Sequence, residues 1–414
     1  MPSQAPSQAP SQPHTDSRRS WARLAITLAV ASVGNAGIWV IIMILPAVQE
    51  TYEISRSAAA IPYAATMAGF ALGNLALGRA VDAFRVAPVL FFAALVVACG
   101  YFLAPRAGSV ALLSVCQMLI GFGSSVCFGP LIADISHWFL RRRGVAVAIT
   151  ACGNYLAGAI WPFALRGVLD NQGWPMVYAA MAVITLLVLV PSAMGLRQRL
   201  PDTAKTQADS LARANRESGG LSPRVMQALL LVAGLACCMA MSMPQVHIVA
   251  LCVDLGFGEV VGAEMLSLML IGGVVSRFAS GFLADRFGGV KTVMIGSVLQ
   301  ALALALYLPS TGMTGLYAVS LAFGLSQGGI VPSYAVIVRE YLPAAEAGTR
   351  VGIVIVATIV GMAFGGWVAG WIYDQTGSYY LAFINGIGWN LLNLAVMLAI
   401  LAGVRRRPDP SLTA

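Results

Sequence analysis

The stretch 261–288, VGAEMLSLMLIGGVVSRFASGFLADRFG, joins an apolar run of membrane-spanning length to a charged turn. Arg277 is a full charge set deep inside that apolar run. An arginine at such a depth costs about 2.5–3.5 kcal/mol on insertion scales and about 10–17 kcal/mol in simulations of an isolated helix. A chain that keeps such a charge usually binds something with it. The stretch therefore predicts a membrane-spanning helix, and an anion is the first ligand to consider.

The composition is that of a membrane protein. Hydrophobic residues make up 58% of the 414 and charged residues 10%, with a mean hydropathy of +0.80. Soluble domains are about 25% charged, and an apolar run of about 18 residues or more crosses the hydrocarbon core as a helix. The twelve predicted spans are 22–46, 58–80, 86–105, 109–134, 143–166, 174–197, 224–252, 260–284, 290–309, 314–338, 349–373 and 379–404.

The basic residues alternate from loop to loop, which indicates orientation rather than nucleic-acid binding. Arg56, Arg106 and Arg166 lie in loops of one sidedness. Apart from these and Arg277, the 25 Lys and Arg residues lie in the two termini and in every second loop. This positive-inside distribution predicts cytoplasmic termini. We expect a multi-pass protein of a bacterial-type plasma (inner) membrane that binds no nucleic acid.

The polar segments divide the chain into two halves of six helices. The N-terminal residues repeat P-S-Q-A, a composition that cannot bury a core. The longest polar segment between helices follows the sixth span. The predicted parts are a disordered cytoplasmic N-terminus (1–20), an N-terminal bundle (21–197), a cytoplasmic linker (198–223), a C-terminal bundle (224–404) and a cytoplasmic tail (405–414).

The two halves also resemble each other in sequence. GRAVD at 78–82 recurs as GFLAD at 281–285, and DNQG at 170–173 recurs as DQTG at 374–377, at nearly equal offsets. Each copy begins on the same side of the membrane, so the repeats are parallel. Parallel six-helix repeats predict an all-α membrane protein of two pseudo-symmetric bundles, with a substrate site at midplane between them.

The string GFLADRFGGVK at 281–291 resembles the signature loop of the major facilitator superfamily. The first copy, GRAVDAFR at 78–85, is degenerate, because Ala83 replaces the usual basic residue. The resemblance implies a loop that closes the cytoplasmic side, its carboxylate meeting a helix N-terminus of the partner half. The alternative is an ordinary short loop with snorkelling charges. The implied gating residues are Gly78, Asp82, Gly281, Asp285 and Arg286.

Three further strings are similar to monocarboxylate transporters and bacterial oxalate/formate-type relatives: 137–158, 244–256 and 369–383. The chain also departs from that branch. Asn35-Ala-Gly-Ile-Trp39 replaces the acidic-Gly-aromatic motif of the eukaryotic first helix, and Gly273 stands where eukaryotic members carry Asp. The lysine that oxalate exchangers carry on the eleventh helix is absent, so a dicarboxylate held between two cations is less expected.

The resemblance implies that Arg277 binds the substrate carboxylate. A guanidinium can hold a carboxylate through two parallel hydrogen bonds, which lysine cannot reproduce. The alternative is a structural arginine held by carbonyls or water. Each of the other embedded polar candidates could instead hold helices together. They are Asn35 and Trp39, one turn apart, Asn154, Tyr155 and Gln327, and Tyr334, which matches a pocket-lining aromatic of monocarboxylate transporters.

Proton coupling requires a titratable group that both sides reach in turn. His247 is the histidine inside a predicted span, and its ordinary pKa near 6.5 suits that role. It could equally be a polar packing residue. Asp254 and Glu264 lie at the outer ends of neighbouring spans and could relay protons. The sequence does not choose among these three.

These observations favour a secondary transporter of a small organic anion. We expect a monomer in the lipid bilayer that moves a monocarboxylate with protons, by alternating access around Arg277. The alternative within transport is a facilitator or exporter of a neutral metabolite or drug, with Arg277 structural. A receptor that kept the fold is a third class. No nucleophile–base pair, metal-ligand spacing or cofactor loop is visible in the sequence, so no enzyme, metal or cofactor is expected.

Overall fold

The computed structural model describes residues 16–139, 143–198, 221–310, 312–342 and 347–405. The predicted N-terminus (1–20), linker (198–223) and tail (405–414) lie largely outside these residues. Twelve helical segments of the described chain are long and apolar enough to cross a membrane. The all-α, twelve-span prediction is therefore confirmed.

The described part of the first half consists of nine α-helices and two short 3₁₀ turns. They are α1 (Arg18–Gly34), α2 (Ala36–Met43), α3 (Leu45–Tyr52), α4 (Arg56–Phe84), α5 (Val86–Leu103), η1 (Ala104–Arg106), α6 (Val110–Ser124), η2 (Ser125–Cys127), α7 (Gly129–Trp138), α8 (Arg143–Gln172) and α9 (Trp174–Gly195). The second half follows with α11 (Pro223–Asp254), α12 (Glu259–Phe287), α13 (Gly289–Tyr307), α14 (Met313–Gln327), α15 (Ile330–Tyr341), α16 (Ala347–Thr376) and α17 (Tyr380–Arg405).

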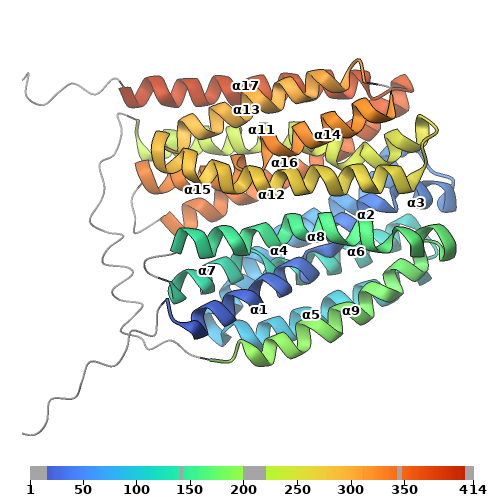
Figure 1. The fold of residues 1–414 in the computed structure, drawn as a ribbon, viewed down its shortest axis with the longest axis horizontal. Coiled ribbons are helices and arrows are strands. Elements are labelled where there is room, and N and C mark those ends of the chain that lie inside the picture. Colours follow the sequence, from blue (N-terminus) through green and yellow to red (C-terminus); the bar gives the residue numbers. More distant parts are fainter. Residues whose placement is uncertain (1–15, 140–142, 199–220, 311, 343–346, 406–414) are drawn as a thin grey trace, which may run out of the picture.

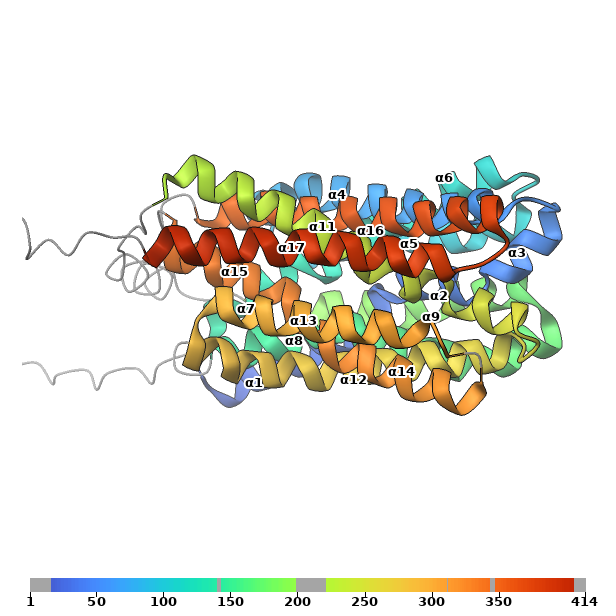
Figure 2. The same cartoon turned by 90° about the horizontal axis from the view of Figure 1, so that it is seen from above.

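The two halves form two bundles whose helices run along the long axis of the molecule (Figures 1 and 2). In Figure 1 the second half lies above the first. We call the end that holds Arg18 and Arg405 the terminal end and the opposite end the far end. Helix α4 packs against α16, and α8 against α12, across the boundary between the halves. These two helix pairs therefore hold the bundles together.

Two spans of the described chain are interrupted at breaks that follow from their residues. Asn35 separates α1 from α2, and its side-chain amide donates to the carbonyl of Ala31 (2.8 Å). The span of α14 and α15 breaks at Gly328–Gly329, where a Cβ on Gly328 would meet the backbone of Gly273. Broken backbone within a membrane needs protein partners. The breaks therefore put carbonyl groups in the interior, where side chains can reach them.

The predicted signature loops are shorter than expected because the helices continue through them. Helix α4 extends to Phe84 and α12 to Phe287, so one residue makes each turn. Gly288 adopts φ 81° and ψ 164°, and Arg85 takes nearly the same conformation at φ 76° and ψ 169°. Side chains are strained there, whereas glycine is not. The degenerate first copy therefore keeps the backbone turn without the glycine that suits it.

Candidate functional site

Three arginines of the described chain are buried, and their partners differ. Arg23 in α1 forms an ion pair with Asp134 (2.7 Å), and Arg56 in α4 forms one with Asp254 (2.6 Å). Arg277 in α12 is 7% exposed and has no carboxylate within ion-pair distance among the described residues. A buried charge without a counter-ion is costly. Arg277 is therefore the buried cation whose charge stays open to a ligand.

The Arg277 guanidinium lies on the boundary between the two halves. Its Nε donates to the carbonyl of Gly328 (3.1 Å), at the break between α14 and α15. Its Nη1 donates to the carbonyl of Ala151, which belongs to α8 of the other half. A guanidinium has five N–H donors, and these two bonds use two of them. The remaining donors can bind further oxygen atoms at the same place.

One predicted residue covers this guanidinium, and two more are linked to it through that residue. The centroid of the Tyr155 ring lies 3.9 Å from the guanidinium carbon of Arg277. The ring of Trp39 meets the Tyr155 ring edge-on, with centroids 6.1 Å apart and planes 73° apart. The indole N–H of Trp39 donates to the carbonyl of Asn154 (2.8 Å). The structure thus brings Tyr155 of the first half to Arg277 of the second, with Trp39 behind the ring and the main chain of Asn154 holding Trp39.

Tyr334 and Asn35 make bonds within their own halves. The hydroxyl of Tyr334 donates to Asn393 (2.9 Å), which in turn donates to Ser297 (2.7 Å), joining α15, α17 and α13. The amide of Asn35 donates to the carbonyl of Cys127 (3.1 Å) and so joins the first and fourth spans. These contacts support the role of holding helices together.

Gln327 and Tyr63 are buried polar side chains without a hydrogen-bond partner in the described structure. Gln327 precedes Gly328, whose carbonyl Arg277 binds. Tyr63 belongs to α4 and its ring lies against Gly366 of α16, on the boundary between the halves. Sequence reasoning missed Tyr63, because one tyrosine in an apolar span carries no positional signal. Both side chains offer polar atoms that a ligand could use.

At the far end, ion pairs cross between the halves. Arg56 of α4 binds Asp254 of α11, and Arg166 of α8 binds Glu264 of α12. Asp374, at the end of α16, accepts the backbone N–H of Arg56 (2.8 Å) and of Ser57 (2.9 Å) at the start of α4. A carboxylate at a helix N-terminus is stabilised by the exposed N–H groups and the helix dipole. We call these three contacts the far-end clasp.

His247 lies beneath the far-end clasp and is 1% exposed. Its Nε2 is 2.7 Å from the carbonyl oxygen of Gly366 and its Nδ1 is 3.0 Å from the hydroxyl of Tyr379. A carbonyl only accepts, so Nε2 carries the proton and Nδ1 accepts from Tyr379. The neutral ring is thus fully bonded.

The five predicted gating residues lie at the terminal end, in the last turns of α4 and α12. Gly78 and Gly281 have open space where a side chain would stand. Arg286 is exposed, with its guanidinium carbon 5.5 Å from the ring of Phe287. The side chains of Asp82 and Asp285 lie outside what the structure describes. The gating role of all five residues stays a prediction.

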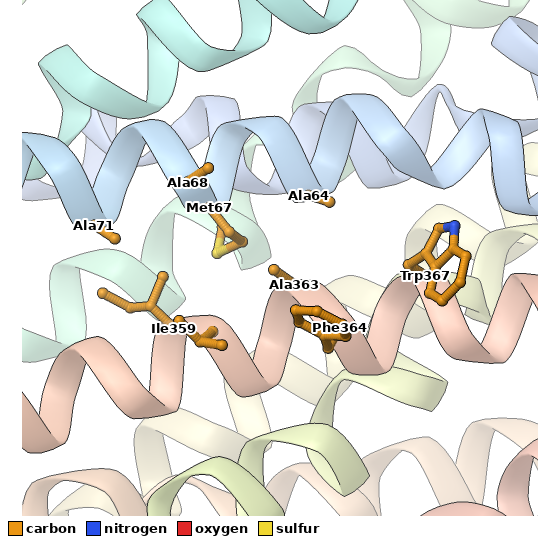
Figure 3. A pocket seen from close by; sticks show the side chains of 9 residues that line it. Ala64, Met67, Ala68, Ala71, Ile359, Ala363, Phe364 and Trp367 are labelled. Carbon is orange, nitrogen blue, oxygen red and sulfur yellow. The ribbon is translucent and has the colours of Figure 1, made fainter. Parts of the chain in front are cut away.

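An apolar groove of about 320 Å³ lies between α4 and α16 (Figure 3). Its lining residues are Ala64, Met67, Ala68 and Ala71 of α4, with Ile359, Val360, Ala363, Phe364 and Trp367 of α16. None of these side chains carries a charge to recognise a carboxylate. Among the described residues, no group of three or more His, Cys, Asp or Glu is placed to hold a metal ion.

Comparisons with known proteins agree with this architecture. The family model described as Major Facilitator Superfamily matches residues 26–288 and 230–414. A solved structure of a bacterial homolog to the human lysosomal transporter Spinster, in an inward-facing and occupied conformation, superposes with a TM-score of 0.74. It covers 97% of this chain and 100% of its own, at 13% sequence identity, and so shows the fold.

Curated relatives are transporters. Monocarboxylate transporter 13 of Bos taurus is 25% identical over 285 residues, 68% of this chain and 66% of that protein. The Rattus norvegicus protein of the same name is 24% identical over 76% of this chain and 73% of its own. The agnestins efflux protein AgnL12 of Paecilomyces divaricatus is 23% identical over 68% and 63%. The aligned stretch thus spans just under two thirds of the bovine and Paecilomyces proteins. The chain belongs to the major facilitator superfamily and is an integral multi-pass membrane transporter similar to monocarboxylate transporters.

Proposed function

We propose that this transporter carries a small organic anion, a monocarboxylate, and that Arg277 binds its carboxylate. The observation that supports this most is the contrast among the buried arginines: two have a carboxylate partner and Arg277 does not. A substrate carboxylate would supply the missing negative charge. Trp39, Tyr155 and the unpartnered Gln327 and Tyr63 would surround the rest of the molecule.

Substrate binding would compete with the bond between Arg277 and the carbonyl of Ala151. That bond joins α12 to α8 across the boundary between the halves. A carboxylate that takes two parallel N–H donors forms stronger bonds than a neutral carbonyl. Loading would therefore loosen one link between the bundles and neutralise the buried charge at the same time. Both effects favour the rocking motion of alternating access.

The carboxylates of the far-end clasp could couple proton binding to opening of the far end. Protonation of Asp254 or Glu264 would remove the charge that holds Arg56 or Arg166 of the other half. His247 would take a proton only when opening of the far end exposes it, because both ring nitrogens are bonded in the closed state. We place the terminal end in the cytoplasm and the far end outside a bacterial-type inner membrane, with the protein acting as a monomer.

A second candidate is export or facilitated passage of a neutral metabolite or drug. The backbone carbonyls on Arg277 favour it, because they would let the arginine serve structure alone. The similarity to a fungal protein named for efflux of agnestins also favours it. In that case transport of the neutral substrate would not depend on the guanidinium.

Uptake into proteoliposomes separates the two candidates. Radiolabelled lactate, pyruvate, oxalate and aromatic acids, together with neutral compounds of similar size, are offered under an imposed pH gradient to the native protein, to Arg277→Ala and to Arg106→Ala. Arg106 is an exposed far-end arginine over the ring of Phe102 and serves as the matched control. We expect monocarboxylate uptake that Arg277→Ala lowers about 100-fold or more, since charge-assisted bonds contribute about 1.5–3 kcal/mol each. Uptake of a neutral compound that survives Arg277→Ala would establish the second candidate instead.

A further inference from the structure

Gly273 lies one helical turn before Arg277 in α12 and touches the ring of Tyr155. A Cβ built on Gly273 would lie 2.7 Å from both Cδ2 and Cε2 of that ring. Real side chains do not approach so closely, so any residue other than glycine would have to displace the ring. The ring is backed by Trp39, which is itself fixed by its bond to the carbonyl of Asn154. The ring has little room to retreat.

The same ring covers the Arg277 guanidinium at 3.9 Å. A cation over an aromatic face is attracted most strongly where water is excluded, and both residues are buried. The ring therefore stands where an acidic side chain at position 273 would reach Arg277. Contact with the ring leaves the guanidinium with its full positive charge, whereas an acid would cancel it.

We propose that Gly273 and Tyr155 form a positioning pair that makes the site selective for monoanions. Glycine admits the ring, and the ring fixes Arg277 without neutralising it. The empty site then carries one positive charge and becomes neutral when a monocarboxylate binds. A dianion would leave one unpaired negative charge inside the membrane, which is costly. The selectivity rests on the proposed function, while the packing of the pair does not.

Thermal unfolding of the purified full-length protein tests the packing without any substrate. Gly273→Ala should lower the Tm by several degrees, whereas Gly281→Ala, on the same helix with open space around it, should keep or slightly raise the Tm because alanine is the better helix former. In a Tyr155→Ala background, Gly273→Ala should lower the Tm by at most half as much as in the native protein, because the ring that it would displace is absent. A Tm of Gly273→Ala equal to that of Gly281→Ala, or full additivity in the double variant, would overturn the pair.

Uptake kinetics test the positioning. Tyr155→Phe keeps the ring and should keep the KM for a monocarboxylate within about 2-fold, whereas Tyr155→Leu should raise the KM about 10-fold or more, consistent with loss of a desolvated cation–π contact. The preference for lactate over oxalate should also fall in Tyr155→Leu. An unchanged KM and an unchanged preference would overturn the positioning role. If the Tm changes of Gly273→Ala and Tyr155→Ala are not additive but the native protein takes up no carboxylate, the proposed function fails. The packing of Gly273 against Tyr155 then still stands.

Discussion

Arg56 and Arg277 are both buried arginines that reach across to the opposite half, yet they end on different partners. Arg56 binds the carboxylate of Asp254, and Arg277 binds the main-chain carbonyl of Ala151. The first charge is neutralised inside the protein and the second is not. Burial alone therefore does not distinguish the far-end clasp from the proposed binding site. The charge of the partner does.

The comparison implies different responses to substitution. Removing one member of a buried ion pair leaves the other charge unpaired at a cost of about 3–5 kcal/mol. The Asp254 side chain is 23% exposed, which lowers this cost. Changes at the far-end clasp should move the balance between conformations, whereas changes at Arg277 should remove substrate binding.

Arg56→Gln should have the largest effect at the far end. It deletes the charge that holds Asp254 and removes a cation from above Tyr373, so we expect a loss of about 1–3 kcal/mol from the closed state. Spin labels on Asn171→Cys and Gln375→Cys, at the exposed far ends of α8 and α16, report the opening as a longer distance. The native cysteines are replaced in this background.

The matched control adds Asp254→Asn to Arg56→Gln. With both charges gone, no unpaired carboxylate remains, and part of the lost stability should return. An unchanged distance distribution in Arg56→Gln would show that the pair does not hold the far end closed. The carboxylate partner of Arg56 would then not explain a role different from that of Arg277.

Asp374→Asn should have a smaller effect in the same direction. Asp374 caps the start of α4 from the opposite half, and the amide keeps one acceptor but loses the charge. A helix cap is worth about 0.5–2 kcal/mol, and its charge is only part of that. We expect a modest lengthening of the same spin-label distance, and none if Asp374 caps the helix without joining the halves.

Glu340→Gln provides the comparison within one half and should have the smallest effect. Glu340 accepts the N–H of Gly289 at 3.1 and 3.2 Å, so α15 caps α13 at the terminal end. Burial raises the pKa of Glu340 above its ordinary value of 4.5, and the bond from Gly289 only partly opposes this. The folded protein therefore binds this proton more tightly than the unfolded chain.

Stability contributed by this proton should fall as the pH rises above 4.5 through the raised value. Tm measured from pH 4 to 7 checks the sign: Glu340→Gln should flatten the decline slightly and leave the far-end distance unchanged. A steeper decline of Tm with pH in Glu340→Gln would contradict the raised pKa. A longer far-end spin-label distance would contradict a role confined to the second half.

The sequence predicted the helices well because each span must bury its backbone polar groups along a long apolar run. It also held an unused clue to the far-end clasp. Arg56 and Arg166 were exceptions to the loop-by-loop charge bias, and in the structure they are the partners of Asp254 and Glu264. Basic residues on the less basic side of a membrane protein are worth pairing with acids on the same side.

The surroundings of Arg277 could not be predicted in this way. Two of its partners are main-chain carbonyls, at Ala151 and Gly328, and every residue has a carbonyl. The third is the face of Tyr155, whose position depends on the missing side chain of Gly273. Only the packing of α8, α12 and α14 brings these groups to one place.

The carbonyl of Ala151 has a consequence for mutational scanning and for sequence drift. Almost any residue at position 151 supplies the same oxygen, provided that α8 keeps its path. Alanine scanning along α8 would therefore not detect this acceptor, and related chains can differ at the position while retaining the bond. Backbone editing, such as an ester in place of the peptide bond that follows Ala151, weakens the acceptor and would show what the link contributes.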